Sequence, residues 1–142
     1  MPTKKYPRLT VKAEWLAPSE VNQLLPLASI HLNPHRPADL KQNHNKHQIK
    51  SMSINNRTFD VACAQQFQLI EHKNDIEHHF ELGKEIVSYD DTNDLLAKIS
   101  YYLKNQKERK QIALNARKRV LTDHTFLQRI EKMMTIIKEE IE

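Results

Sequence analysis

The sequence predicts an α/β fold, in which helices pack around a partial parallel β-sheet and further helices follow at the C-terminal end. Two patterns support this prediction. Short apolar runs of strand length alternate with segments of helical periodicity over most of the chain. The last third of the chain has helical periodicity alone. Because strands that alternate with helices usually run parallel, we expect a thin parallel sheet of about four strands.

The first half of the chain contains two of the expected strands, separated by a helix. Residues 9–16 have the composition of a short strand. Ser19 is a candidate N-cap for a helix over residues 20–27, and residues 30–32 alternate as a strand would. The polar stretch 36–51 that follows is rich in Asn, His and Lys. It predicts a long surface loop or a broken helix.

The middle of the chain contains the other two expected strands. A helix is expected over residues 55–64, followed by a buried strand over residues 67–70. Asn74 is a candidate cap for a short helix that ends at Phe80, and a glycine provides the turn after it. Residues 85–89 then form the last expected strand.

Three helices are expected after the last strand. Asp90 or Asp91 caps the first, whose apolar residues recur at helical spacing as far as residue 103. A break at residues 104–105 leads into a second helix that continues through Val120. The third covers residues 125–141 and carries an apolar stripe. Because its polar face mixes Lys and Glu, we expect this stripe to pack on its own domain rather than on a membrane.

Length and composition indicate a single domain over residues 1–142, large enough to bury a core. No apolar run approaches the roughly 18–20 residues that a membrane-spanning helix needs, so no span is expected. Cys63 is the only cysteine and cannot form an internal disulfide, which favours a reducing compartment. A cytoplasmic protein is therefore expected.

The charge pattern and the glycine content exclude several classes of binding site. The net charge of +4 is spread among acids, and no nucleic-acid-binding module is recognisable, which disfavours nucleic acid as a partner. Gly83 is the only glycine, so the chain has neither a dinucleotide-binding glycine fingerprint nor a P-loop. A phosphate site would therefore depend on helix termini and side chains.

Histidine and cysteine spacing do not indicate a metal site. The chain has eight histidines, but their spacing matches no zinc-protease pattern and no second cysteine is present. We expect no metal and no other cofactor. Cys63 lies in the apolar string VACA, which predicts a buried structural cysteine rather than a nucleophile.

The stretch SINNRTFDVACAQQFQL, residues 53–69, contains the candidate binding residues. Asn55, Asn56 and Arg57 lie at the expected start of a helix, where free N–H groups attract phosphate and an arginine adds a charge-assisted contact. Asp60, one turn further on, could accept hydrogen bonds from a sugar diol. Equally, Asn55 or Asn56 caps this helix, and Asp60 complements the helix dipole in its first turn. The residues alone leave both interpretations open.

Short motifs follow one another in a fixed order over residues 55–126, after the segment VKAEWLAPSEVNQLLPLASIHLNPHR at residues 11–36, and with it they cover roughly residues 8–140. They are Asn55-x-Arg57-x-Phe59-Asp60, the segment 80–85, Tyr89-Asp90, the segments 101–103 and 109–113, and His124-Thr125-Phe126. Their order and spacing resemble the C-terminal part of group 1 glycosyltransferase-like proteins, in particular the CgeB spore-maturation branch. No one of these motifs is specific alone; their combination is.

The resemblance implies the C-terminal part of a GT-B architecture, a partial Rossmann-like domain that holds a nucleotide-sugar donor. It places Asn55, Asn56 and Arg57 near the donor phosphates and Asp60 near the ribose. It also implies that the chain is truncated at its N-terminal side and needs a partner chain or missing sequence to supply the N-terminal half. No residue is assigned a catalytic role.

The chain departs from the family pattern at three positions. Asp60 stands where the family has Glu, Gln65 stands where it has a glycine, and Met52 stands where the broader group has an acid. The lost glycine, the shortened acid and the missing N-terminal half favour an alternative function, a non-catalytic remnant with a structural or interaction role in spore or cell-surface assembly. A weaker third hypothesis is a basic protein associated with nucleic acid.

Overall fold

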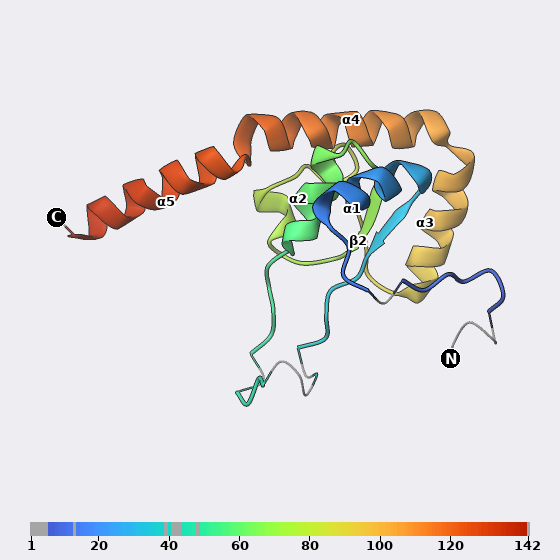
Figure 1. Cartoon of the computed structure of the whole chain (residues 1–142), viewed down its shortest axis with the longest axis horizontal. Helices are drawn as coiled ribbons and strands as arrows, with labels where there is room; N and C mark the ends of the chain where they lie inside the picture. The colour runs from blue at the N-terminus through green and yellow to red at the C-terminus, as the bar shows by residue number, and fades with distance from the viewer. Residues whose placement is uncertain (1–5, 13, 39, 41–43, 48, 142) are drawn as a thin grey trace.

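In the computed structural model, the described residues are 6–12, 14–38, 40, 44–47 and 49–141. Their central element is a three-stranded parallel sheet in the order β1-β2-β3 (Figure 1). The strands are β1 (His31–Asn33), β2 (Gln68–Glu71) and β3 (Val87–Tyr89). Leu69 of β2 is in register with Leu32 of β1 and with Val87 of β3. The expected α/β class with a parallel sheet is confirmed.

The strand expected over residues 9–16 is not formed. Its described residues, 9–12 and 14–16, have irregular structure, and Leu9 and Val11 are 45% and 52% exposed. A strand must satisfy its backbone N–H and C=O groups through a neighbouring strand. Within the described residues, no strand of the sheet pairs with this segment. Local composition therefore predicted an element for which the fold provides no partner.

Helices precede, cover and follow the sheet. They are α1 (Pro18–Leu24), the 3-10 helix η2 (Leu25–Leu27), α2 (Asn56–Cys63), the 3-10 helix η4 (Ile76–His78), α3 (Thr92–Lys104), α4 (Gln106–Asp123) and α5 (Phe126–Ile141). Between β1 and α2, the described part of the expected loop has turns and irregular structure, and residues 39, 41–43 and 48 lie outside the described residues.

Two helix starts differ from the prediction. Helix α1 begins at Pro18, before the predicted cap, because the fixed φ of proline suits the first helical position. The Glu20 carboxylate then accepts a hydrogen bond from the backbone N–H of Ala17 at 2.8 Å. In place of the helix expected over residues 74–80, the structure has only the 3-10 turn η4. The residue at its N-cap position is Asp75 rather than Asn74, and the Asp75 side chain forms no capping hydrogen bond. Of the two caps proposed for α3, Asp91 is the one used.

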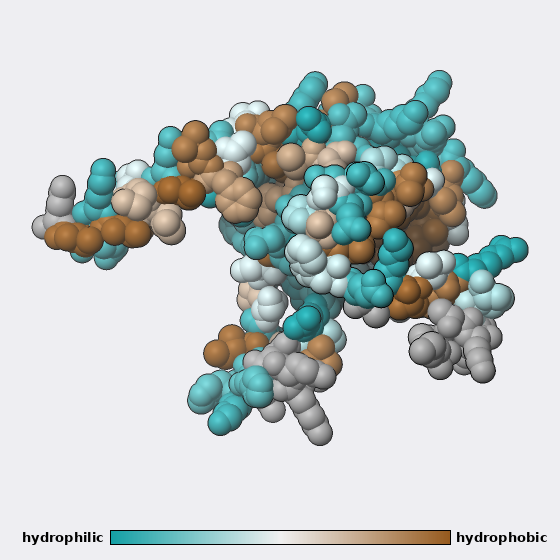
Figure 2. Space-filling model, viewed as in Figure 1, coloured by the Kyte–Doolittle hydropathy of each residue, from teal (hydrophilic) through white to brown (hydrophobic). Residues whose placement is uncertain are grey.

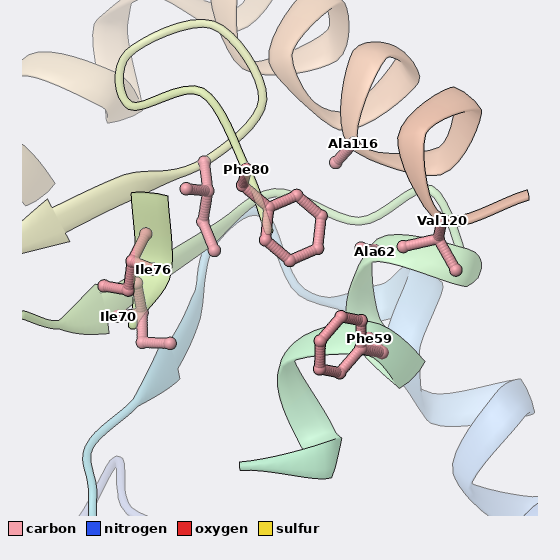
Figure 3. Close-up of a cluster of buried hydrophobic side chains, with 8 residues drawn as sticks. Phe59, Ala62, Ile70, Ile76, Phe80, Ala116 and Val120 are labelled. Carbon is pink, nitrogen blue, oxygen red and sulfur yellow. The ribbon is translucent and has the colours of Figure 1, made fainter. Parts of the chain in front are cut away.

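The core lies on both faces of the sheet. Leu69 and Ile70 are adjacent on β2, so their side chains point to opposite faces. Ile70 belongs to a cluster built with α2 and α4, namely Phe59, Ala62, Ile76, Phe80, Ile86, Ala116 and Val120 (Figure 3). Leu69 belongs to a second cluster with α3 and α4, namely Phe67, Val87, Tyr89, Tyr102, Ile112 and Ala113. Helix α4 contributes to both clusters and thereby joins the two layers.

Helix α5 extends away from the sheet and the helices that cover it (Figure 1). It has no buried residue, and in Figure 1 it projects beyond the end of α4. Its first turns contact the body where the Arg129 guanidinium lies 4.2 Å from the centre of the Phe59 ring. The expectation that the apolar stripe of this helix packs on its own domain is therefore wrong for the described chain. The stripe lies on the surface, where Figure 2 shows it as a row of apolar residues.

None of the helices in the described part of the chain combines the length and the apolar content that crossing a bilayer requires.

Candidate functional site

The start of α2 is fixed by Asn55. Its backbone is extended, and its Oδ1 accepts hydrogen bonds from the backbone N–H of Thr58 at 3.1 Å and from Thr58 Oγ1 at 3.2 Å. This is the geometry of an N-cap, which satisfies one of the free N–H groups at the helix start. The predicted cap is confirmed, and it uses the side-chain oxygen of Asn55.

A buried polar network anchors this cap to the sheet. Asn33 at the end of β1 is fully buried, and its Nδ2 lies within 3.1–3.2 Å of acceptors on Asn55, Thr58 and Gln68. In return, Asn55 Nδ2 donates to Asn33 Oδ1 at 2.9 Å, and Gln68 Nε2 donates to the Thr58 carbonyl at 2.8 Å. Both ends of the Asn55 amide are therefore bonded within the protein. The network positions the start of α2 directly beyond the end of β1.

The sequence interpretation missed Asn33 and Gln68. The available signal was one amide side chain at each of two predicted strands, Asn33 directly after residues 30–32 and Gln68 within residues 67–70. Buried amides of this kind require partners, because an unpaired one costs about 1–3 kcal/mol. Which partners they find depends on the register between β1 and β2, which no local pattern specifies.

The other three predicted residues lie on the exposed face of α2. Asn56, Arg57 and Asp60 are exposed, and Arg57 and Asp60 are one helical turn apart. Arg57 lines a pocket of about 720 Å³, the Arg57 pocket, together with Pro34, His35, Arg36, Ser51, Ser53, Ile54 and Asn55. Asp60 lines a different one of about 750 Å³, the Asp60 pocket, together with Trp15, Leu16, Pro18, Val21, Asn22, Leu25, Pro26, Cys63, Ala64 and Arg117. The structure thus places Arg57 and Asp60 in two separate pockets along α2, and Asn56 lines neither of them.

His35, two residues beyond β1, is buried beside the Arg57 pocket. Its side chain is 6% exposed, and neither ring nitrogen has a hydrogen-bond partner among the described residues. Burial lowers the pKa of His35, the nearby Lys73 lowers it further, and Glu71 opposes both. The imidazole is therefore neutral near pH 7, with one N–H to donate and one nitrogen to accept a hydrogen bond.

Glu71 is the last residue of the neighbouring strand β2, Lys73 lies two residues further on, and Glu71 contacts His35. The backbone N–H of His35 donates to Glu71 Oε2 at 2.9 Å, and Lys73 Nζ lies 3.9 Å from Glu71 Oε1. These residues line a third pocket of about 430 Å³, which shares His35, Arg36 and Ser51 with the Arg57 pocket. Met52, at the position where the family pattern has an acid, also lines this third pocket.

Sequence reasoning also missed His35 and Arg36. Both follow directly after a parallel strand, and ligands of parallel α/β sheets bind outside the carboxyl ends of the strands. That rule could have drawn attention to them. The burial of His35, however, depends on the neighbouring strand β2 and cannot be read from the segment NPHR.

Cys63 and Gln65, at the end of α2 and just after it, differ from what the sequence predicted. Cys63 is exposed, whereas Val61 and Ala62 before it are buried, because consecutive helical residues point about 100° apart. Gln65, where the family pattern has a glycine, has a φ of 56°. The left-handed turn that glycine favours is therefore kept in the backbone despite the glutamine. Among the described residues, no group of three or more metal-ligating side chains is arranged to hold a metal ion.

Comparison with known proteins agrees with the fold and with the motifs. A family model described as glycosyl transferase-like matches residues 3–135. A spore protein of Bacillus subtilis (strain 168), CgeB, is 34% identical over 122 residues, which is 86% of this chain and 37% of that protein. The chain thus spans little more than a third of this relative's length.

No solved structure matches the chain. The family match nevertheless covers nearly the whole sequence, including the α2 segment and both pockets that flank it. The identity to CgeB extends over most of the same residues. The chain belongs to the glycosyl transferase-like family.

Proposed function

We propose that this chain binds the nucleotide-sugar donor of a glycosyl transfer reaction, with the donor diphosphate at the start of α2. One observation carries the proposal. The helix N-terminus, the exposed Arg57 and the buried His35 side chain, whose ring nitrogens form no hydrogen bond with a described residue, meet at the carboxyl end of β1. Family membership supports a sugar-nucleotide ligand over other anions.

Each of these groups suits a diphosphate. The first N–H groups of α2 point out of the helix and carry partial positive charge, which favours bound phosphate. Arg57 can donate two parallel hydrogen bonds to phosphate oxygens, and the exposed Asn56 beside it adds an amide donor. A neutral His35 can donate one further N–H from a site that excludes most water. The role of Asn55 in this arrangement is to position the helix rather than to contact the ligand.

The chemistry assigned to this end of the sheet is stabilisation of the departing diphosphate. When the bond between the sugar anomeric carbon and the phosphate oxygen breaks, negative charge grows on that oxygen. Donors fixed in advance around that oxygen lower the barrier because they need no rearrangement during the reaction. The arrangement assigns no base or nucleophile to a described residue.

The acceptor side of the reaction is proposed to come from outside this chain. The chain covers 37% of the length of CgeB, and the described residues form one sheet with its covering helices. We propose that further sequence or a partner chain supplies the other half of a two-domain transferase, in the cytoplasm. On its own, the chain is then a donor-binding unit.

The proposal is tested by calorimetric titration of the chain with UDP, GDP and their hexose conjugates. We expect binding that Arg57→Ala weakens by about tenfold or more, because a charge-assisted phosphate contact is lost. His35→Ala should weaken binding in the same direction. Lys118→Ala is the matched control, because Lys118 is an exposed cation on α4 outside both pockets.

Two results would count against the proposal. One is the absence of binding by any of these nucleotides at about 1 mM, the weak end of specific affinity. The other is binding that Arg57→Ala and Lys118→Ala leave equally unchanged. Either result would favour the structural role considered as the alternative, which the comparisons do not otherwise support.

A further inference from the structure

The Asp60 pocket has two chemically different walls. One wall is apolar and comes from the segment before β1, where Trp15 and Val21 face the pocket. The other is polar and comes from α2 and α4, where Asp60 and Arg117 line it. Arg117 is held in place, since its guanidinium donates to the Cys63 carbonyl at 2.7 Å. A ligand with one flat apolar face and several hydroxyl groups would match both walls.

Trp15 is the most unusual residue of this pocket. It is the only tryptophan of the chain, and it is 82% exposed. A tryptophan side chain buries roughly 150–250 Å² of surface when it is covered. An indole exposed to water at the edge of a pocket therefore offers a large surface for stacking. Bases of any kind stack on such rings, because every base has a π-face.

Asp60 supplies the second half of the argument. Its carboxylate is exposed and forms no hydrogen bond or ion pair with any described residue. A free carboxylate accepts hydrogen bonds from neighbouring hydroxyl groups. Arg57 lies one turn earlier on the same face and lines the Arg57 pocket, where the diphosphate is proposed to bind. The Cβ atoms of residues at this spacing are about 5–6 Å apart. Phosphate, sugar and base sites would therefore follow one another along α2.

We propose that Trp15 is the stacking platform for the base of the bound nucleotide, next to the ribose position that the family resemblance implies for Asp60. This inference rests on the proposed function, since it names where the nucleoside part of the same donor lies. The base packs against the indole in the Asp60 pocket, while the diphosphate occupies the Arg57 pocket. Because stacking is tolerant of base identity, Trp15 contributes affinity for nucleosides in general rather than selection among them.

The single tryptophan makes the inference directly measurable. We expect UDP and GDP to change the intrinsic tryptophan fluorescence of the full chain in a saturable manner, with the same dissociation constant that calorimetry gives. Trp15→Ala should weaken UDP binding by about fivefold to a hundredfold, the usual effect of removing one stacking ring. Trp15→Phe should retain part of the affinity, because a smaller ring still stacks.

Inorganic pyrophosphate separates the stacking site from the phosphate site. It lacks a base, so its affinity should be the same for the unchanged chain and for Trp15→Ala, and should still fall with Arg57→Ala. Leu27→Ala is the matched control for loss of an exposed apolar side chain, because Leu27 is 79% exposed and lies outside the Asp60 pocket. Circular dichroism should show that Trp15→Ala and Leu27→Ala keep the helix content of the unchanged chain.

The outcomes distinguish this inference from the proposed function. If UDP binds by calorimetry while fluorescence is unchanged and Trp15→Ala binds as tightly as the unchanged chain, the stacking site is wrong and the donor site stands. If neither UDP nor GDP binds at about 1 mM, both proposals fail.

Discussion

Helices α2 and α5 have similar sequence patterns and opposite environments. Both carry apolar residues along one side. Helix α2 has eight residues, and four of them, Thr58, Phe59, Val61 and Ala62, are buried. Helix α5 has sixteen residues and none is buried. The shorter helix is therefore part of the core, and the longer one lies outside it.

The difference arises from the neighbours that chain connectivity provides. Helix α2 lies between β1 and β2 in sequence, so it must return along the sheet, and α4 then packs against it. Helix α5 follows α4 after a short break at residues 124–125, and no later described element returns to cover it. An amphipathic stripe shows that a helix has a face suited to burial. It does not identify what buries that face.

The largest expected effect is a matched pair of phenylalanine substitutions. Phe59 is 8% exposed and contacts the rings of His79, Phe80 and His124, whereas Phe126 is 82% exposed. Phe59→Ala should lower the free energy of unfolding by about 3–5 kcal/mol, because it leaves a cavity in the core. Phe126→Ala should change it by less than about 0.5 kcal/mol. Urea denaturation measures both.

Equal destabilisation by the two substitutions would mean that α5 is covered in solution. Sedimentation at several protein concentrations would then show whether a second molecule covers it. A large loss at Phe59 with none at Phe126 supports the contrast between the two helices.

A smaller effect is expected at the start of α2. Asn55→Ala removes the cap oxygen and leaves the side-chain Oδ1 of Asn33 without its donor. It should lower the free energy of unfolding by about 1–3 kcal/mol. Asn56→Ala, at the adjacent exposed position, is the control and should change it by about 0.5 kcal/mol or less.

The Asn55→Ala variant also separates an effect on structure from an effect on ligand binding. If Asn55 acts by positioning the helix, Asn55→Ala lowers stability and weakens nucleotide binding together. A stable Asn55→Ala chain that has lost nucleotide affinity would instead show direct contact between Asn55 and the ligand. Thermal unfolding and calorimetric titration of the same samples provide both measurements.

The smallest effect concerns pH. Burial lowers the pKa of His31 below 6.5, opposed by its contact with the Leu25 carbonyl, and burial lowers the pKa of His79, opposed mainly by Asp75. Well above pH 6.5 both rings are neutral in the folded and in the unfolded chain. Below 6.5 the unfolded chain takes up protons first, so folding stability falls as the pH falls. Proton NMR titration of the imidazoles should give values below 6.5.

Replacing one of these histidines tests whether their lowered pKa values cause the loss of folding stability at low pH. His79→Gln should reduce the slope of unfolding free energy against pH between about 6.5 and 5, the range in which an unfolded histidine titrates. A slope that is unchanged, or stability that rises on acidification, would contradict the buried environment of these histidines.

Much of the local structure was predictable from the sequence. The helix over residues 55–64, the strands after it and the caps at Asn55 and Asp91 were found within a residue or two of the predicted positions. These features depend on neighbours within about four residues along the chain, such as a cap oxygen and the N–H that it accepts. The order of the motifs also indicated the family.

The tertiary structure decided the rest. It left the described residues of the segment 9–16 without a strand partner, buried the His35 side chain against the end of β2, and exposed Cys63 and α5. It also assigned Arg57 and Asp60 to separate pockets. Each of these outcomes depends on side chains and backbone groups that are far apart in sequence and meet only when the strands pair. A local pattern can show which residues suit burial or binding, but the contacts that realise either are made between distant segments.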